Sequence, residues 1–342
     1  MIRKNDSRGL DFARAVIALA EAKGGIDHAI MIAEGTYGRD ARPTAFLQKA
    51  AIAPASTQVD SWAGVLADEV TTEFIELVNE ASVFGRIGLR KVPLNINLAS
   101  LSAGATAYWR GETTPAPLSK GTTTSDTLQP LCVSALAAVS KEILRFGATG
   151  SESFIRAELV RVCAAAIDAA FLDPANGGSA NVKPASVLDG VSAIGFGSDY
   201  DFAIKALIDD FGGDFETAYF VARPKTFVSL HDSLVRPLIG ARGGELCGLP
   251  AIASRNVPDP AGGELLILID GQAIATGDQG IEVSVSTETS IEMADDASGA
   301  AAQTSLWQAG LAAIKVDRHV NWAAMRDSVS YMSGLQLHDT SA

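Results

Sequence analysis

The residues that most often carry out chemistry are scattered along this 342-residue chain. The histidines are His28, His231, His319 and His338, and no two of them have the H-x-x-x-H or H-E-x-x-H spacing that places zinc ligands on one helical face. Ser229 lies two positions before His231, which suggests a hydrolytic triad, but the G-x-S-x-G turn of a nucleophilic serine is absent. Neighbours two positions apart on a helix also do not face each other. We therefore expect no metal site, no cofactor and no catalytic residues.

Two further patterns are weak. The run from Gly240 to Gly244 has the glycines of a phosphate-binding loop but lacks its G-K-[ST] ending, so we expect a flexible exposed loop. The adjacent carboxylates at 209–210 and 295–296 match no two-carboxylate catalytic site. A hydrolase built on Ser229, His231 or a carboxylate pair is the least favoured alternative.

Composition and charge narrow the class of protein. Hydrophobic residues make up 47% of the chain and charged residues 20%, which is enough apolar material for a core. The formal charge is -13 and the pI about 4.8. DNA binding depends on Lys and Arg that neutralise phosphates, so this chain is a poor direct DNA binder, although an acidic wall could enclose DNA.

The cysteines and the hydropathy indicate a cellular compartment. Cys132, Cys163 and Cys247 form no C-x-x-C pair, which fits a reducing cytoplasm. Cys163 falls in a helical apolar stripe and is expected to be a buried thiol. No apolar run reaches the roughly 18 residues of a membrane helix. We expect a protein that is cytosolic where it is made.

The N-terminal part differs from the rest. Leu10–Lys23 predicts an amphipathic helix closed by Gly24 and Gly25. The stretch Ala41–Trp62 is rich in Ala, Pro, Ser and Thr and predicts an extended linker. We therefore expect residues 1–70 to form an arm without a core of its own.

A long polar stretch at Ser100–Gln129 predicts a β-hairpin. Its expected strands are Ala105–Trp109 and Leu128–Val139, with a tip near Pro115–Thr124. A hairpin this long with no core needs support from outside, and a neighbouring subunit is the simplest source. Our candidates for contacts between subunits are its bulky or charged side chains: Tyr108, Trp109, Arg110, Glu112 and Lys120.

The second half predicts helices and strands in mixed order. Thr149–Phe171 is the most regular helix, with a capping box at Thr149 and Glu152 and apolar residues every three or four positions. Asp199–Phe211 is a second helix, expected to turn Phe202, Ala206 or Leu207, and Phe211 inward. The further expected elements are strands at Ile87–Ile96, Thr217–Ala222, Leu249–Ser254, Leu265–Ile269, 281–286 and 314–323 and a helix from Pro224 towards Leu234.

The order of these parts resembles the major capsid proteins of tailed bacteriophages, whose shell fold is called the Hong Kong 97 type. The similarity covers about residues 70–335. It rests on stretches that follow one another in the family's order: EFIEL from Glu73, SVFGR from Ser82, YWRGETTPAP from Tyr108, VSKEIL from Val139 and GLPAIASRNVP from Gly248.

The resemblance implies an α+β fold and a division of the chain. The implied parts are an N-terminal arm or scaffold-like region (1–70), a peripheral domain (71–194 with 276–335) holding an extended loop (98–138) and a spine helix (149–171), an axial domain (195–275) and a tail (336–342). The implied function is self-assembly through hexamers and pentamers into an icosahedral capsid around double-stranded DNA. The virion would assemble in the bacterial host cytoplasm, with portal, scaffold or decoration proteins as further partners and no membrane.

Two points stay open within the resemblance. An encapsulin-like cellular compartment shares the fold and is the alternative function. Some family members crosslink a Lys of the extended loop to a distant Asn, and Lys120 is suitably placed. No Asn occurs between Asn256 and Asn321, however, so we expect no such crosslink.

Overall fold

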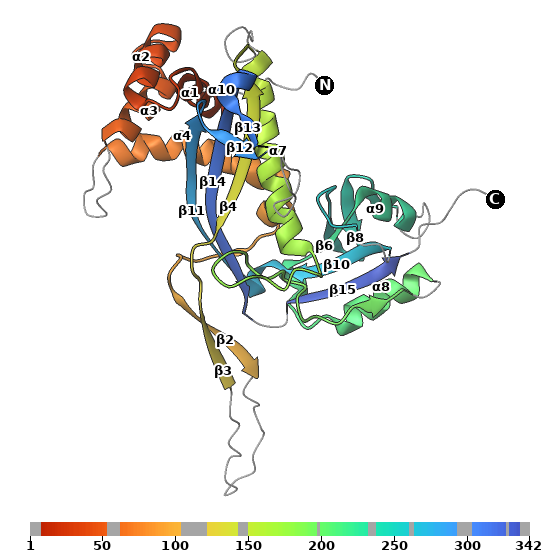
Figure 1. Ribbon diagram of the computed structural model, residues 1–342. Coiled ribbons are helices and arrows are strands. Elements are labelled where there is room, and N and C mark those ends of the chain that lie inside the picture. Colours follow the sequence, from red (N-terminus) through yellow and green to blue (C-terminus); the bar gives the residue numbers. More distant parts are fainter. Residues whose placement is uncertain are drawn as a thin grey trace, which may run out of the picture. The chain divides into compact units, whose positions relative to one another are not determined.

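The computed structural model describes residues 8–52, 62–103, 122–142, 150–196, 199–231, 237–259, 263–292, 303–325 and 328–335 (Figure 1). The chain forms two compact units, each of which mixes helices and strands. The helical unit comprises Met1–Ala81, Val133–Ala164 and Gly280–Arg318, and the sheet unit comprises Ser82–Cys132, Ala165–Gln279 and His319–Ala342. The division into arm, peripheral and axial domains stays a prediction.

The N-terminal helices of the helical unit pack on one another. They are α1 (Leu10–Glu21), α2 (Ile26–Tyr37), α3 (Arg42–Ile52) and α4 (Trp62–Ala81). Their shared core is mostly alanine: Ala15, Ala18, Ala22, Ala29, Ala33 and Leu47. On another side of α1, the ring of Phe12 stacks on Phe74 with centroids 4.3 Å apart.

The expectation of an extended linker at Ala41–Trp62 and of an arm without a core is wrong for the described residues. Helix α3 begins at Arg42, and Pro43 fits its first turn because the amide that proline lacks has no helical partner there. Residues 53–61 lie outside the described residues.

Helix α7 (Gly150–Leu172) confirms the predicted long helix. Ile155, Leu159, Cys163 and Ile167 are buried along it, as expected. The long strands β11 (Ile274–Ser286) and β14 (Leu311–Ala324) are also confirmed. They belong to a four-stranded sheet of order β1-β11-β14-β4, with β1 at Arg90–Lys91 and β4 at Cys132–Ser140. A small hairpin, β12 (Ser290–Glu292) with β13 (Gln303–Ser305), precedes α10 (Leu306–Ala309).

A seven-stranded sheet organises the sheet unit, in the order β5-β15-β10-β6-β9-β8-β7. Its strands are β5 (Ile194–Gly195), β6 (Ala218–Ala222), β7 (Ile239–Gly240), β8 (Gly243–Leu246), β9 (Leu249–Ala253), β10 (Glu264–Asp270) and β15 (Val329–Leu335). Every residue of β10 is buried. Such a continuous apolar run is typical of a strand covered on both faces. The sheet also includes β15, which comes from a part of the sequence far from the predicted axial domain.

Helices α8 (Tyr200–Asp210) and α9 (Pro224–Leu230) pack into this core. Ala203, Ile204 and Leu207 of α8 are buried, as is Phe211 after its end. Phe202 is 67% exposed, so the prediction that it points inward is wrong. The buried positions recur from Leu207 at three- and four-residue steps, and Phe202 falls one position off that stripe.

The predicted strand Ile87–Ile96 is mostly wrong. The chain forms the short helix α5 (Val83–Arg86), and only Arg90–Lys91 pairs as a strand, parallel to β11. Pro93 lacks an amide for a ladder, and Asn95 adopts φ 62°, a turn conformation.

Two glycines meet where β10 begins beside β15. A β-carbon added to Gly263, at φ 110°, would lie 2.7 Å from the α-carbon of Gly334, itself at φ 83°. The ladder between the two strands shifts register at this end, between Glu264 and Leu266. Both positions therefore require glycine.

Candidate functional site

The β2–β3 ribbon is the described part of the predicted hairpin. Strands β2 (Asn97–Ala103) and β3 (Thr122–Thr127) pair antiparallel from Asn97 opposite Thr127 to Ala103 opposite Thr122, with a register shift after Leu101 (Figure 1). These two strands make up a sheet of their own. An isolated two-stranded ribbon is marginally stable in water, so this one is suited to gaining a further partner.

An apolar cluster anchors the ribbon at its base. Leu94, Leu98, Leu128 and Ala275 are buried together there. The Asn95 amide donates to the Leu128 carbonyl oxygen at 2.8 Å, and the Leu128 amide donates to the Ile96 carbonyl oxygen at 3.1 Å. The ribbon is thus anchored at its base within the sheet unit.

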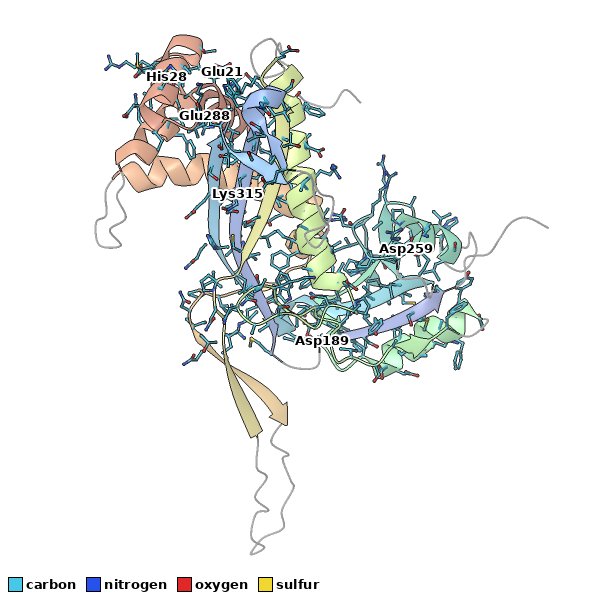
Figure 2. The ribbon with its side chains drawn as sticks, in the orientation of Figure 1. Glu21, His28, Asp189, Asp259, Glu288 and Lys315 are labelled. Atoms are coloured by element: carbon cyan, nitrogen blue, oxygen red, sulfur yellow. The ribbon has the colours of Figure 1, made fainter. Side chains whose placement is uncertain are left out.

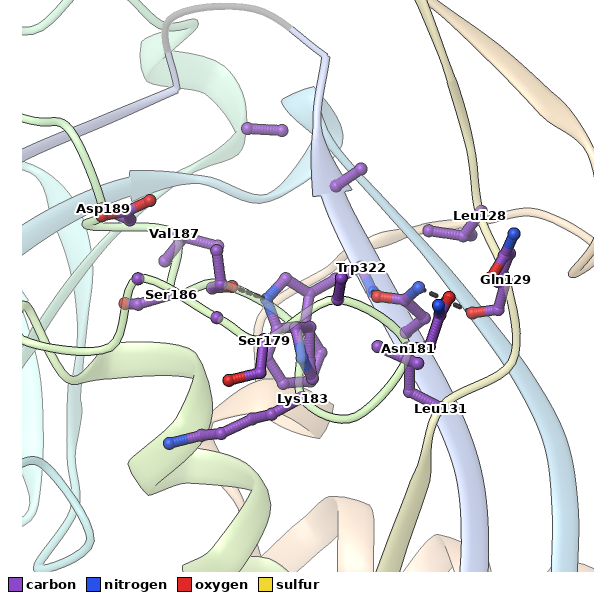
Figure 3. Close-up of a pocket in the computed structure, with 18 of the residues that line it drawn as sticks. Leu128, Gln129, Leu131, Ser179, Asn181, Lys183, Ser186, Val187, Asp189 and Trp322 are labelled. Atoms are coloured by element: carbon purple, nitrogen blue, oxygen red, sulfur yellow. Dashed lines mark hydrogen bonds between the residues drawn. The ribbon is translucent and has the colours of Figure 1, made fainter.

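A pocket of about 680 Å³ lies beside the ribbon base (Figure 3). Gln129 and Leu131, the loop at 177–189 and the end of β14 line it. The indole nitrogen of Trp322 donates to the Ala185 carbonyl oxygen at 2.8 Å and so fixes that loop. The charged side chains of the lining are those of Lys183 and Asp189 (Asp189 is labelled in Figure 2), and the lining contains no histidine or cysteine.

The sequence-predicted contact residues Tyr108, Trp109, Arg110, Glu112 and Lys120 lie outside the described residues. Their role therefore stays a prediction. The strand expected at Ala105–Trp109 also lies outside the described residues. The strand expected at Leu128–Val139 is confirmed in most of its length by β4 (Cys132–Ser140), and β2 and β3 are strands that the sequence analysis did not predict.

The described residues of the hydrolase alternative are not arranged for catalysis, and its carboxylate pair at 295–296 lies outside the described residues. The Ser229 hydroxyl donates to the carbonyl oxygen of Lys225 at 3.1 Å, one turn back on α9. The His231 Nδ1 lies 2.8 Å from the carbonyl oxygen of Ile239. Both side chains are engaged with backbone, and Asp210 accepts a hydrogen bond from the Ser330 hydroxyl at 2.8 Å. Within the described ranges, no three His, Cys, Asp or Glu side chains could hold a metal ion.

The glycine run at 240–244 is a tight turn between β7 and β8, so the expectation of a flexible exposed loop is wrong. Gly240 pairs with Gly243 and Ile239 with Gly244 in an antiparallel ladder. A β-carbon on Gly244 would clash with the Leu238 carbonyl oxygen, so the glycine serves close backbone approach.

Sequence reasoning missed a buried carboxylate in α7. The oxygens of Asp168 accept hydrogen bonds from the backbone amides of Val83 (3.0 Å) and Phe84 (3.1 Å) and from the side chain of Asn256 (2.8 Å). Burial outweighs these bonds and raises the pKa of Asp168 to about 6. Beside it, the Phe84, Phe171 and Trp322 rings pack with centroids 5.3 to 5.5 Å apart. A carboxylate one position from the apolar stripe, next to Ile167, was the available signal.

Cys163 is a buried thiol, as expected, and burial raises its pKa to about 11. A thiol with so high a pKa stays protonated and unreactive at neutral pH. No described helix is both long enough and apolar enough to span a bilayer.

The described residues thus form two mixed units and a separate two-stranded ribbon. The chain belongs to the phage capsid family, whose model matches residues 63–303. This match covers the ribbon and most of the chain that follows it.

A curated relative and several solved structures agree with this membership. The chain is 33% identical to the capsid polyprotein of Pseudomonas phage PAJU2 over 362 aligned positions, which cover 96% of this chain and 54% of that protein. It therefore spans about half the length of that relative.

The solved structures share the fold at low identity. One is the capsid of a native GTA particle, with 15% identity, a TM-score of 0.51 and coverage of 73% of this chain and 89% of that chain. Another, from Mycobacterium phage Ogopogo, has 16% identity, a TM-score of 0.52 and coverage of 74% and 92%. The α+β fold of Hong Kong 97-type capsid proteins, expected from the sequence, is confirmed.

Proposed function

We propose that this chain assembles with copies of itself, through hexamers and pentamers, into an icosahedral capsid that encloses double-stranded DNA. The observation that carries the proposal is the β2–β3 ribbon, a two-stranded sheet within a region that matches the phage capsid family. A two-stranded ribbon is marginally stable by itself and gains stability by lying on a neighbour. Contacts of this heterologous kind close into rings and then into a shell.

The charge supports enclosure of DNA without sequence-specific binding. A subunit with a formal charge of -13 has no counterion-release drive towards phosphates, and a wall of such subunits repels the packaged polymer. Portal, scaffold and decoration proteins are the further partners of such a shell. Assembly would take place in the bacterial host cytoplasm, and the product would be the virion capsid.

The predicted parts receive roles in this proposal. The axial domain at 195–275 surrounds the hexamer and pentamer axes, and the peripheral domain carries the spine helix. The extended loop at 98–138 reaches over a neighbour with Tyr108, Trp109, Arg110, Glu112 and Lys120 as contact candidates. Each contact can be modest, because every subunit makes many of them at once.

Electron microscopy of the purified chain, with light scattering on the same sample, tests assembly. Closed shells, or hexamer and pentamer rings, are expected. A chain that stays monomeric across salt and protein concentration, even with scaffold partners supplied, would refute the proposal.

Deletion of residues 115–124 tests the role of the hairpin. We expect the deleted chain to keep the thermal unfolding midpoint of the wild-type monomer and to form no closed shells. Normal shells from the deletion would overturn the assigned role of the loop. Assembled particles should also dissociate to single chains on a denaturing gel, because no Asn is placed to crosslink Lys120.

A further inference from the structure

Hydrogen bonds join the two helices of the α2–α3 hairpin within the helical unit. Its turn is closed by the Thr44 hydroxyl, which donates to the Gly38 carbonyl oxygen at 2.8 Å. Between the two helices, the Gln48 side chain donates to Glu34 at 3.0 Å. These two bonds tie α2 to α3 within the hairpin.

The buried apolar contact between this hairpin and α1 is made mostly of small side chains. Alanine supplies most of the shared core: Ala15, Ala18 and Ala22 from α1 meet Ala29 and Ala33 from α2. Alanine removes little apolar surface from water, so each such pair stabilises the contact less than a leucine pair would. Leu47 is the larger side chain buried in this core, and the partly buried Leu19, Ile30, Ile32 and Phe46 pack against it. The Phe46 ring also meets Phe12 edge-on, with centroids 6.4 Å apart.

Polar contacts at the hairpin turn supply the remaining attachment. The Tyr37 hydroxyl, at the end of α2, donates to Glu152 of α7 at 3.4 Å. Arg42, at the start of α3, donates to Glu73 of α4 at 2.9 Å. Both acceptors are largely shielded, since their side chains are 15% and 21% exposed.

Helix α1 joins these contacts into one network. Arg14 of α1 donates to Glu152 at 2.9 Å and lies over the Tyr37 ring, with its guanidinium carbon 5.5 Å from the ring centroid. Asp11 lies within 3.3 Å of Arg14 and 3.8 Å of Arg42. Burial and the Glu152 charge raise the pKa of Tyr37 to about 12, so its hydroxyl keeps the proton that it donates.

A hinge lies at the opposite end of the hairpin. The four residues between α1 and α2 include Lys23 at φ 57° and Gly24 at φ 83°. The Gly24 amide donates to the Leu19 carbonyl oxygen at 2.9 Å, which closes α1 before the chain turns. A change of backbone angles at Gly24 and Gly25 would swing α2 and α3 away from α1.

We propose that α2–α3 is a strap, hinged at 22–25 and latched to α4 and α7 by the Arg14–Glu152–Tyr37 and Arg42–Glu73 contacts. Opening the strap uncovers the alanine face of α1 and separates Phe46 from the edge of Phe12, while Phe12 stays stacked on Phe74. The helical unit thereby gains a second, open state without losing its remaining packing. The strap does not depend on shell assembly.

Hydrogen exchange of the soluble full-length chain, followed by mass spectrometry, tests the latch. Glu152→Gln removes the charge shared by Arg14 and Tyr37, and we expect amides of residues 26–52 to exchange about tenfold faster, since hydrogen bonds to charged groups contribute substantially. Amides of α4 and α7 should keep their wild-type rates. Tyr37→Phe removes only the hydroxyl and should give a smaller acceleration in the same segment.

A matched control lies on the same helix. Glu158 pairs with Arg161 at 2.6 Å on the exposed side of α7, and Glu158→Gln should leave the exchange of 26–52 unchanged. High salt should accelerate exchange of 26–52 in the wild type and have less effect in Glu152→Gln. Unchanged exchange in Glu152→Gln and Tyr37→Phe, or an equal acceleration across α4 and α7, would overturn the strap.

Discussion

The seven-stranded sheet and the β2–β3 ribbon differ in how many strands pair with one another: seven in the sheet and two in the ribbon. Strand β10 is buried along its whole length and has a neighbour on each side. The ribbon pairs two strands rich in Thr, Ser and Ala, and its described apolar packing lies at the base, around Leu98 and Leu128. In the proposed shell, the sheet is stable within one chain, and the ribbon gains its support from a second chain.

The substitution expected to lower the free energy of unfolding most lies in the core of the sheet unit. Phe220 of β6 is fully buried in the core cluster of the sheet unit. Phe220→Ala should lower the free energy of unfolding by about 4 kcal/mol, because it removes a large buried ring and leaves a cavity. Urea unfolding of the monomer measures this loss, and a change under about 1 kcal/mol would contradict the self-sufficient core.

The dry interior should also make stability depend on pH through Asp168. Its folded pKa of about 6 lies above the ordinary value of 3.8. The folded state therefore binds the proton more tightly, so this contribution is full below pH 4 and is lost as the pH rises through 6. The loss amounts to about 3 kcal/mol.

Asp168→Asn isolates this contribution. The free energies of unfolding of the wild type and of the variant are measured at pH 4 and at pH 7. Between these two pH values, the wild type should lose about 3 kcal/mol of stability relative to the variant. Parallel pH profiles would show that the carboxyl group is not desolvated in the folded chain.

The ribbon anchor should give an intermediate effect. Leu128 is 2% exposed in a small cluster at the ribbon base. Leu128→Ala should cost about 2 kcal/mol, at the lower end of the range for leucine truncation, because few side chains surround it. Assembly should suffer more than the monomer, since the ribbon loses its fixed direction. Thermal unfolding and particle counts by microscopy separate the two, and normal shell yield would contradict this anchoring role.

The substitution expected to change the free energy of unfolding least is Phe202→Ala, which is the aromatic control for Phe220→Ala. Phe202 on α8 is 67% exposed. Phe202→Ala should change the monomer's free energy of unfolding by less than about 0.5 kcal/mol, because little surface is removed from contact. A loss comparable to that of Phe220→Ala would show that the sheet unit buries this ring against something else.

The sequence predicted the helices and strands whose apolar pattern lies within one short stretch of residues. Helix α7 follows from apolar residues at three- and four-residue steps, and β10 follows from its uninterrupted apolar run. Helix α3 was missed because Ala, Pro and Thr favour linkers in isolation, and only packing of Leu47 on α1 makes them helical. Strand β15 pairs with β5 and β10 across long stretches of sequence, and no local signal carries such a partner. The Asp168 contacts also depend on tertiary folding, since Val83 and Asn256 are far away in the sequence.

The close approach of Gly263 and Gly334 has a consequence for evolution. A side chain at Gly263 would run into the backbone of Gly334, and both glycines have left-handed backbone angles. A single replacement at either position therefore meets a steric barrier that a second replacement nearby cannot easily relieve. Among related sequences, these positions should be retained or lost together with the register shift of β10 on β15, as a coupled pair rather than as two independent sites.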